Sequence, residues 1–304
     1  MNLLRKSFLT IAALAGSAFM FFGCASTSGL TDTLSSLSSA AADSGMGTAA
    51  SILNASASIS KAAEDITPEQ SYYIGRAVTA TILTNYKPYE NPAIEAYLNK
   101  ICTIITVNSE NPDMYRGYHV KMLDTAEVNA FSTSAGHILV TKGLLSCAKS
   151  EDALAAVIAH EIAHIQLLHS LKSIKTSRFT AAAAATANAA LTVVSNDTEL
   201  ANTLNDMVDD VITDLVNNGY SQGQEFDADE LALTLMADAG YNPKAMDDML
   251  YMMKELQKGK AGGVYKTHPS PEKRIAKVDK ALAKIPMPLD TSSSRVSRFN
   301  SIMK

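Results

Sequence analysis

Three polar side chains with the spacing of a metal site stand in the run HEIAH, namely His160, Glu161 and His164. On an α-helix, His160 and His164 are about one turn apart and share a face, so both imidazoles can reach one metal ion. Glu161 lies beside His160, close enough to contact a water molecule on that ion. The H-E-x-x-H spacing therefore offers two protein ligands for zinc and the general base of a hydrolytic reaction.

The surrounding residues 151–171 predict the helix that this spacing requires. Ser150 is a suitable N-cap, and Glu151 and Asp152 occupy the first turn, where the helix dipole favours acidic side chains. The stretch that follows is apolar and contains neither glycine nor proline. A helix this apolar is buried, so its histidines and glutamate need partners that offset the loss of hydration. A shared metal ion is such a partner.

A third ligand has to come from another part of the chain, because a catalytic zinc site combines three protein ligands with one open position. Ser170 stands ten residues after His160, where some zinc enzymes carry a third histidine, so that arrangement is excluded. If the helix continues, His169 projects about 140° away from His164. We therefore expect His169 to be structural.

Carboxylates close to residue 225 are the alternative source of the third ligand. The candidates are Glu225, Asp227, Asp229 and Glu230. Glu225 and Asp229 are four residues apart and share one face of the predicted helix. A glutamate could bind the metal while an aspartate one turn later accepts the spare N–H of a ligand histidine. The spacing favours this pair, and a solvated acidic helix start is the other interpretation.

The N-terminal 23 residues have the features of a secretory signal. A positive start is followed by an apolar stretch over residues 8–22 that is short for a membrane span. This stretch ends in FFGC, which resembles a bacterial lipobox and implies cleavage before Cys24 and lipid attachment to it. Ala25 favours the outer membrane, facing the periplasm. An exported protein with an incidental cysteine is the alternative.

The rest of the chain divides into a tether, one folded domain and a tail. Residues 24–60, rich in Ser and Ala, are expected to be flexible, and residues 286–304 are expected to form a loose tail. Residues 61–285 predict an α+β domain that is mainly α-helical, with a small antiparallel sheet from three short strands between residues 118 and 141. An edge strand could bind an extended peptide, or the strands could only cover the helix.

Several segments are similar to the M48 family of zinc metallopeptidases, in its periplasmic lipoprotein branch. They are ITPEQSYYIGRAV, NAFSTSAGHILVTKGLL, VIAHEIAHIQLLH, GQEFDADELAL, AGYNPKAM and THPSPEKRI. The resemblance implies a zincin-like fold of the gluzincin type, one Zn²⁺ per chain, Glu225 as third ligand and Asp229 behind the ligands. It also implies that His268 and Arg274 lie near the active site. Either could stabilise the oxyanion, and His268 could bind zinc in a resting state; a helix cap is the alternative.

The implied function is a zinc-dependent endopeptidase of the bacterial cell envelope. Unfolded or misassembled polypeptides would be its substrates, in protein quality control. The alternative is a chaperone-like lipoprotein that binds clients, with weak or gated proteolysis. The net charge of −5 shows no nucleic-acid footprint. Cys102 and Cys147 could form a disulfide or remain free thiols.

Overall fold

The computed structural model describes residues 66–172, 219–257, 267–268, 271–285 and 293–303, together with Ser36 and Ser39. From residue 66 onward these residues belong to one structural unit. Two predicted features lie outside the described residues, namely the signal segment 1–23 with Cys24 and the tether 24–60 apart from the two serines. The alanine-rich residues 181–190 also lie outside them.

Two helices open the described chain, and local sequence explains where each begins. Helix α4, Pro68–Asn85, begins with a capping box in which the Gln70 N–H donates to Thr67 Oγ1 at 3.2 Å and the Thr67 N–H donates to Gln70 Oε1 at 2.9 Å. Helix α5, Pro92–Val107, also has proline in its first turn, where the missing N–H has no cost.

The sheet is mixed, not antiparallel as the sequence predicted. Its strands are β1, His119–Leu123, β2, Ala130–Thr133, and β3, His137–Thr141, in the order β1-β3-β2. β2 and β3 form an antiparallel hairpin, whereas β1 and β3 are parallel. The loop after β1 spans the end of β3, where the Thr141 N–H donates to the Asn129 carbonyl. β3 lies between β1 and β2 and pairs with both strands.

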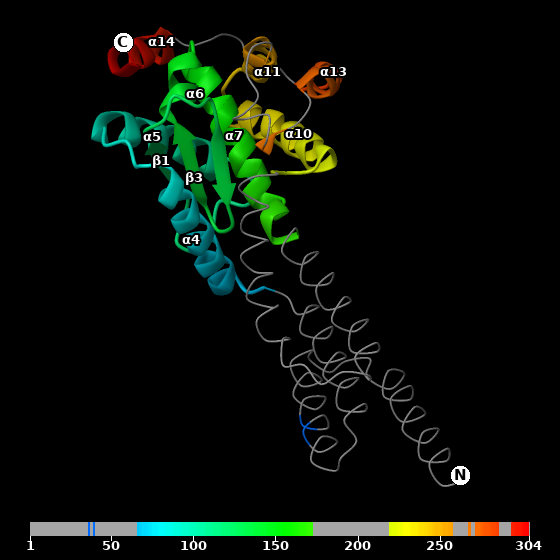
Figure 1. The fold of residues 1–304 in the computed structure, drawn as a ribbon. Helices are drawn as coiled ribbons and strands as arrows, with labels where there is room; N and C mark the ends of the chain where they lie inside the picture. The colour runs from blue at the N-terminus through cyan, green and yellow to red at the C-terminus, as the bar shows by residue number, and fades with distance from the viewer. Residues whose placement is uncertain are drawn as a thin grey trace, which may run out of the picture. The chain divides into compact units, whose positions relative to one another are not determined.

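Helices cover both faces of this sheet (Figure 1). On one face, Phe131 and Leu139 pack against Val78 and Ile82 of α4. On the other face, the buried strand residues join the main core with α5 and helix α7, Glu151–Gln166. Helix α6, Lys142–Cys147, links β3 to α7. The helix that carries the H-E-x-x-H run is therefore packed directly beneath the sheet.

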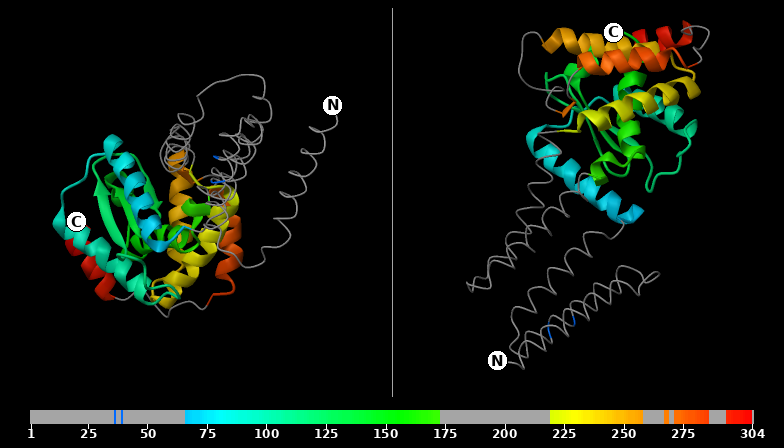
Figure 2. Two further views of the ribbon diagram at one scale, coloured as in Figure 1. Left: turned by 90° about the horizontal axis from the view of Figure 1, so that it is seen from below. Right: turned by 90° about the vertical axis from the view of Figure 1, so that its right-hand side faces the viewer.

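Three helices complete the core around α7. They are α10, Gln222–Asp238, α11, Lys244–Gln257, and α13, Pro271–Leu282. α10 lies alongside α7 and contacts it over much of its length, while α13 packs against both α10 and α11 (Figures 1 and 2). None of the described helices is long and apolar enough to cross a lipid bilayer. Cys102 and Cys147 are both free thiols.

The expected loose tail is wrong for residues 293–303, which form helix α14, Ser293–Met303. Phe299 is buried in the main core, and Arg298 forms an ion pair of 2.6 Å with Glu151. Glu151 is itself buried at the start of α7 and also accepts a hydrogen bond from Tyr97. A short polar helix with one buried apolar residue gives little periodic signal, and its ion pair with Glu151 involves a partner far away in the sequence.

Candidate metal centre

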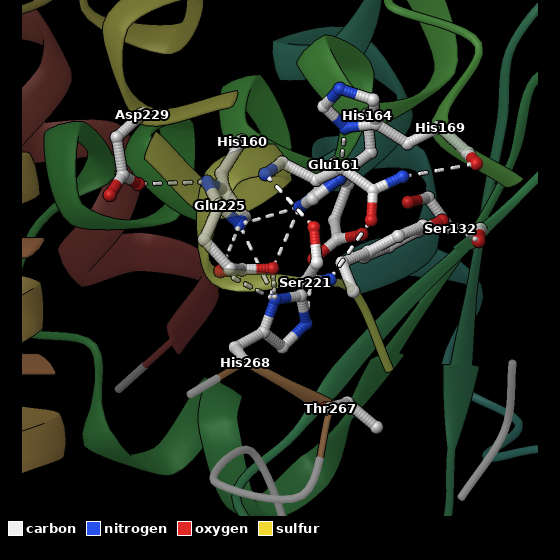
Figure 3. A network of polar contacts seen from close by, with 12 residues as sticks. Ser132, His160, Glu161, His164, His169, Ser221, Glu225, Asp229, Thr267 and His268 are labelled. Carbon is white, nitrogen blue, oxygen red and sulfur yellow. Dashed lines mark hydrogen bonds and ion pairs between the residues drawn. The ribbon is translucent and has the colours of Figure 1, made fainter. Parts of the chain in front are cut away.

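Three predicted ligands converge on one buried point (Figure 3). His160 and His164 come from the middle of α7, and their Nε2 atoms are 3.0 Å apart. Glu225, in the first turn of α10, places Oε2 at 3.4 Å from His160 Nε2 and Oε1 at 3.3 Å from His164 Nε2. The capping box between Ser221 and Gln224 sets the helix start and so positions Glu225.

These separations fit a shared metal ion. Ligands about 2.1 Å from a tetrahedral ion lie roughly 3.4 Å from one another. The donor atoms of the group His160, His164, Glu225 and His268 all lie within 4.8 Å of one another, and all four residues are buried. Two imidazoles and a carboxylate are the ligand types of catalytic zinc sites. The residues present therefore fit a divalent metal such as zinc.

His268 lies where the fourth ligand of such an ion would be. Its Nδ1 is 3.4 Å from His160 Nε2 and 3.0 Å from Glu225 Oε1. The neighbouring residue Thr267 holds this segment in place, because its carbonyl accepts the Tyr220 N–H and its hydroxyl donates to Asn129 Oδ1. In catalytic zinc sites the fourth position is normally open to water. The structure thus brings His268 to the centre itself.

Asp229 and Arg274 form a charged layer behind the ligands. Asp229 Oδ1 lies 3.0 Å from His160 Nδ1, and Arg274 binds Asp229 through two hydrogen bonds of 2.7 and 2.8 Å. Arg274 Nη1 also lies 2.8 Å from Glu225 Oε2. Burial would raise the pKa of Glu225 and Asp229, but Arg274 contributes to holding both pKa values below their usual range. Both carboxylates are therefore ionised at neutral pH.

His169 lies against His164 instead of pointing away, so the prediction from a continuous helix is wrong. α7 ends at Gln166, and Leu168 adopts a φ of 57° that interrupts the helix before residues 169–172 become helical again. The two Nδ1 atoms of His164 and His169 are then 2.9 Å apart. Burial lowers the pKa of His169 to about 4, so this ring is neutral at neutral pH.

Tyr220 is a site residue that the sequence did not reveal. Its ring stacks on His164 with a centroid distance of 3.8 Å and an angle of 13°. Its hydroxyl donates to the Ser132 carbonyl on β2 at 3.0 Å. Locally, only the GYS segment in front of the acidic cluster could have pointed to Tyr220. No spacing rule marks a tyrosine at this position as a site residue.

Glu161 lies beside the centre, and one oxygen of its carboxylate lacks a hydrogen-bond partner among the described residues. It is buried, and Oε1 lies 3.6 Å from His268 Nε2. Among the described residues, Oε2 has no hydrogen-bond partner. A buried carboxylate oxygen without a protein partner marks a place for a water molecule or a substrate N–H. This is the position that a general base needs.

Residues 88–282, more than half of the chain, match the model of Peptidase family M48. The chain belongs to peptidase family M48. All four clustered side chains lie within the matched region. The metal centre of this M48 chain is therefore part of the family domain, and the predicted zincin-like fold is confirmed.

Named relatives of this M48 chain are proteases from mitochondria and bacteria. It is 32% identical to the mitochondrial metalloendopeptidase OMA1 of Schizosaccharomyces pombe, over 64% of this chain and 55% of OMA1. It is 27% identical to the metalloprotease LoiP of Escherichia coli, over 60% of this chain and 69% of LoiP. It is 22% identical to the beta-barrel assembly-enhancing protease of Escherichia coli, over 67% of this chain and 41% of that protein. The match thus spans about half the length of OMA1 and less of the assembly-enhancing protease.

Proposed function

We propose that this M48 chain is a zinc-dependent endopeptidase with His160, His164 and Glu225 as metal ligands and Glu161 as general base. The observation that carries the proposal is the convergence of two imidazoles and one carboxylate at the spacing of a tetrahedral ion. Membership of a peptidase family supports peptide bonds as the substrate class.

The side chains around the centre have different roles in the proposed hydrolysis. A bound zinc ion would supply Lewis acidity toward the carbonyl and lower the pKa of its water. Glu161 would accept a proton at Oε2 and deliver it to the leaving amine. Asp229 accepts the Nδ1–H of His160, which leaves Nε2 of that ring free to bind the metal. Arg274 keeps Asp229 and Glu225 in place, because its guanidinium faces both carboxylates.

The site of action that we propose is the bacterial cell envelope, with unfolded or misassembled polypeptides as substrates. Support comes from the signal-like residues 1–23, which end at the lipobox with Cys24 as the lipidated residue. It also comes from a relative named for beta-barrel assembly, because such barrels span outer membranes. These features together support the proposal of attachment to the outer membrane, facing the periplasm.

Metal analysis combined with a cleavage assay tests this function. The purified chain should contain one zinc ion and cleave unfolded casein, lose cleavage when a chelator removes the metal, and regain it when zinc is restored. A protein that lacks zinc after purification and does not bind added zinc would contradict the proposal. Zinc binding without cleavage of casein would instead favour the client-binding alternative.

Gated proteolysis is the second candidate, because the site is covered in the structure. β2 is an edge strand, and two of its carbonyls already have partners from outside the sheet. The Ser132 carbonyl accepts from Tyr220, and the Ala130 carbonyl lies 3.4 Å from His268 Nε2. A peptide that docks along this edge has to displace these partners. His268 also lies in the fourth ligand position. Its displacement by a peptide would therefore also free that position on the metal.

Replacement of His268 separates its two predicted roles. If His268 closes the site, His268→Ala should raise the rate of casein cleavage several-fold. If His268 stabilises the oxyanion, the same variant should lose about 10²–10³-fold in kcat. His119→Ala is the matched control, because His119 is exposed and lies outside the cluster. An unchanged rate would contradict both roles.

A further inference from the structure

The Nδ1 atoms of His164 and His169 face each other at 2.9 Å. Two ring nitrogens at this distance form a hydrogen bond only if they share one proton. His164 turns its other nitrogen, Nε2, toward His160 and Glu225, where the metal binds. A neutral imidazole that binds metal through Nε2 carries its proton on Nδ1. The contact therefore runs from the His164 N–H to the unprotonated Nδ1 of His169.

We propose that His169 is a positioning residue that fixes the tautomer and ring orientation of the metal ligand His164. Asp229 has the equivalent contact with the other ligand histidine, at 3.0 Å from His160 Nδ1. Each ligand ring is then held by its own acceptor, one a carboxylate and one an imidazole. A neutral acceptor at His164 orients the ring without adding a further negative charge to the centre.

The backbone conformation that places His169 for this contact is energetically unfavourable. Leu168 adopts a left-handed conformation with a φ of 57°, which residues with a branched side chain rarely take. This interruption of the helix places His169 against His164, where the His169 ring is buried. Tyr220 stacks on the face of the His164 ring, and His169 contacts its edge. Together the two contacts restrict the tilt of the ring and its rotation within its plane.

The main chain of His169 is also tied to the third ligand. The Gln224 side chain donates from Nε2 to the His169 carbonyl at 3.3 Å. Gln224 belongs to the capping box at the start of α10 and immediately precedes Glu225. His169 thus contacts one ligand through its ring and is linked by its carbonyl to the turn that supplies Glu225.

Three substitutions of His169 test the role through zinc binding. Asn can place its amide oxygen near the position of Nδ1, Gln places it one bond further out, and Leu has no acceptor. His169→Leu and His169→Gln should weaken zinc binding about 10–100-fold, whereas His169→Asn should stay within about threefold of wild type. Zinc dissociation constants would be measured by competition with a chromogenic chelator. Thermal unfolding of the metal-free proteins identifies any variant that does not fold.

The inference rests on the proposed metal centre, and the readouts separate the two. If the wild type binds zinc and all three variants bind it equally well, His169 has no positioning role. Equal losses in folded Asn, Gln and Leu variants would also overturn the inference, because an acceptor at Nδ1 would then be irrelevant. A wild type that binds no zinc would contradict the proposed function itself. A wild type that binds zinc without cleaving casein leaves the His169 test intact.

Discussion

Glu161→Gln should reduce peptide cleavage about 10²–10⁴-fold while zinc binding and the fold remain intact. Gln has the shape of Glu but cannot accept the proton of the attacking water at neutral pH. Glu161 is next to the ligand His160, yet its carboxylate contacts only His268, at 3.6 Å, among the donor groups of the cluster. The loss should therefore appear in kcat, with the zinc dissociation constant within a few-fold of wild type.

Zinc content, the rate of casein cleavage and thermal unfolding would be measured side by side for Glu161→Gln. Glu230→Gln is the matched control, because Glu230 is an exposed glutamate on α10 that faces away from the buried ligands. The control should keep the wild-type rate. Retention of more than about a tenth of wild-type activity in Glu161→Gln would exclude Glu161 as the general base.

Arg274→Met should lower the free energy of unfolding of the metal-free protein by about 3–5 kcal/mol. Arg274 is 1% exposed and faces the carboxylates of Asp229 and Glu225, which are 2% and 0% exposed. Without the guanidinium, two negative charges would remain close together in a site that excludes water. Zinc bound at the proposed site would supply positive charge near Glu225, so the loss should be smaller in the metal-bound protein.

Chemical denaturation with and without zinc measures both parts of this prediction. Lys273→Met is the control, because it removes a neighbouring charge from the exposed side of α13 and should change stability by less than about 0.5 kcal/mol. A change below about 1 kcal/mol in metal-free Arg274→Met would show that the carboxylates find other partners. Equal losses with and without zinc would contradict a shared electrostatic role.

Local rules were sufficient to predict the positions of the two proposed ligands on α7 and of the proposed base. The cap at Ser150, the acidic first turn and the apolar run all act within α7, and a regular helix converts the spacing of His160 and His164 into a shared face. The same rule placed Glu225 and Asp229 on one face of α10, and the two carboxylates do reach the two ligand histidines. Helical periodicity alone favoured this pair over its acidic neighbours.

The errors arose where the chain leaves regular structure. His169 was placed by extending α7, but the helix ends at Gln166 and Leu168 interrupts the regular backbone. The sheet was expected to be antiparallel, but β1 and β3 are parallel. α14 was expected to be a loose tail, but Arg298 reaches the buried Glu151. Periodicity reports neither where a helix ends, nor which strands pair, nor which distant residue a tail packs against.

By itself, the sequence determined which residue types could hold a metal, the helix that carries them and the family to which they belong. Only the tertiary structure decided how the centre is completed. It brought His268 to His160 across 108 positions of the chain, stacked Tyr220 on His164 and committed Arg274 to two carboxylates. Spacing within a helix follows from local backbone geometry, whereas these contacts follow from how the elements pack around a site that excludes water.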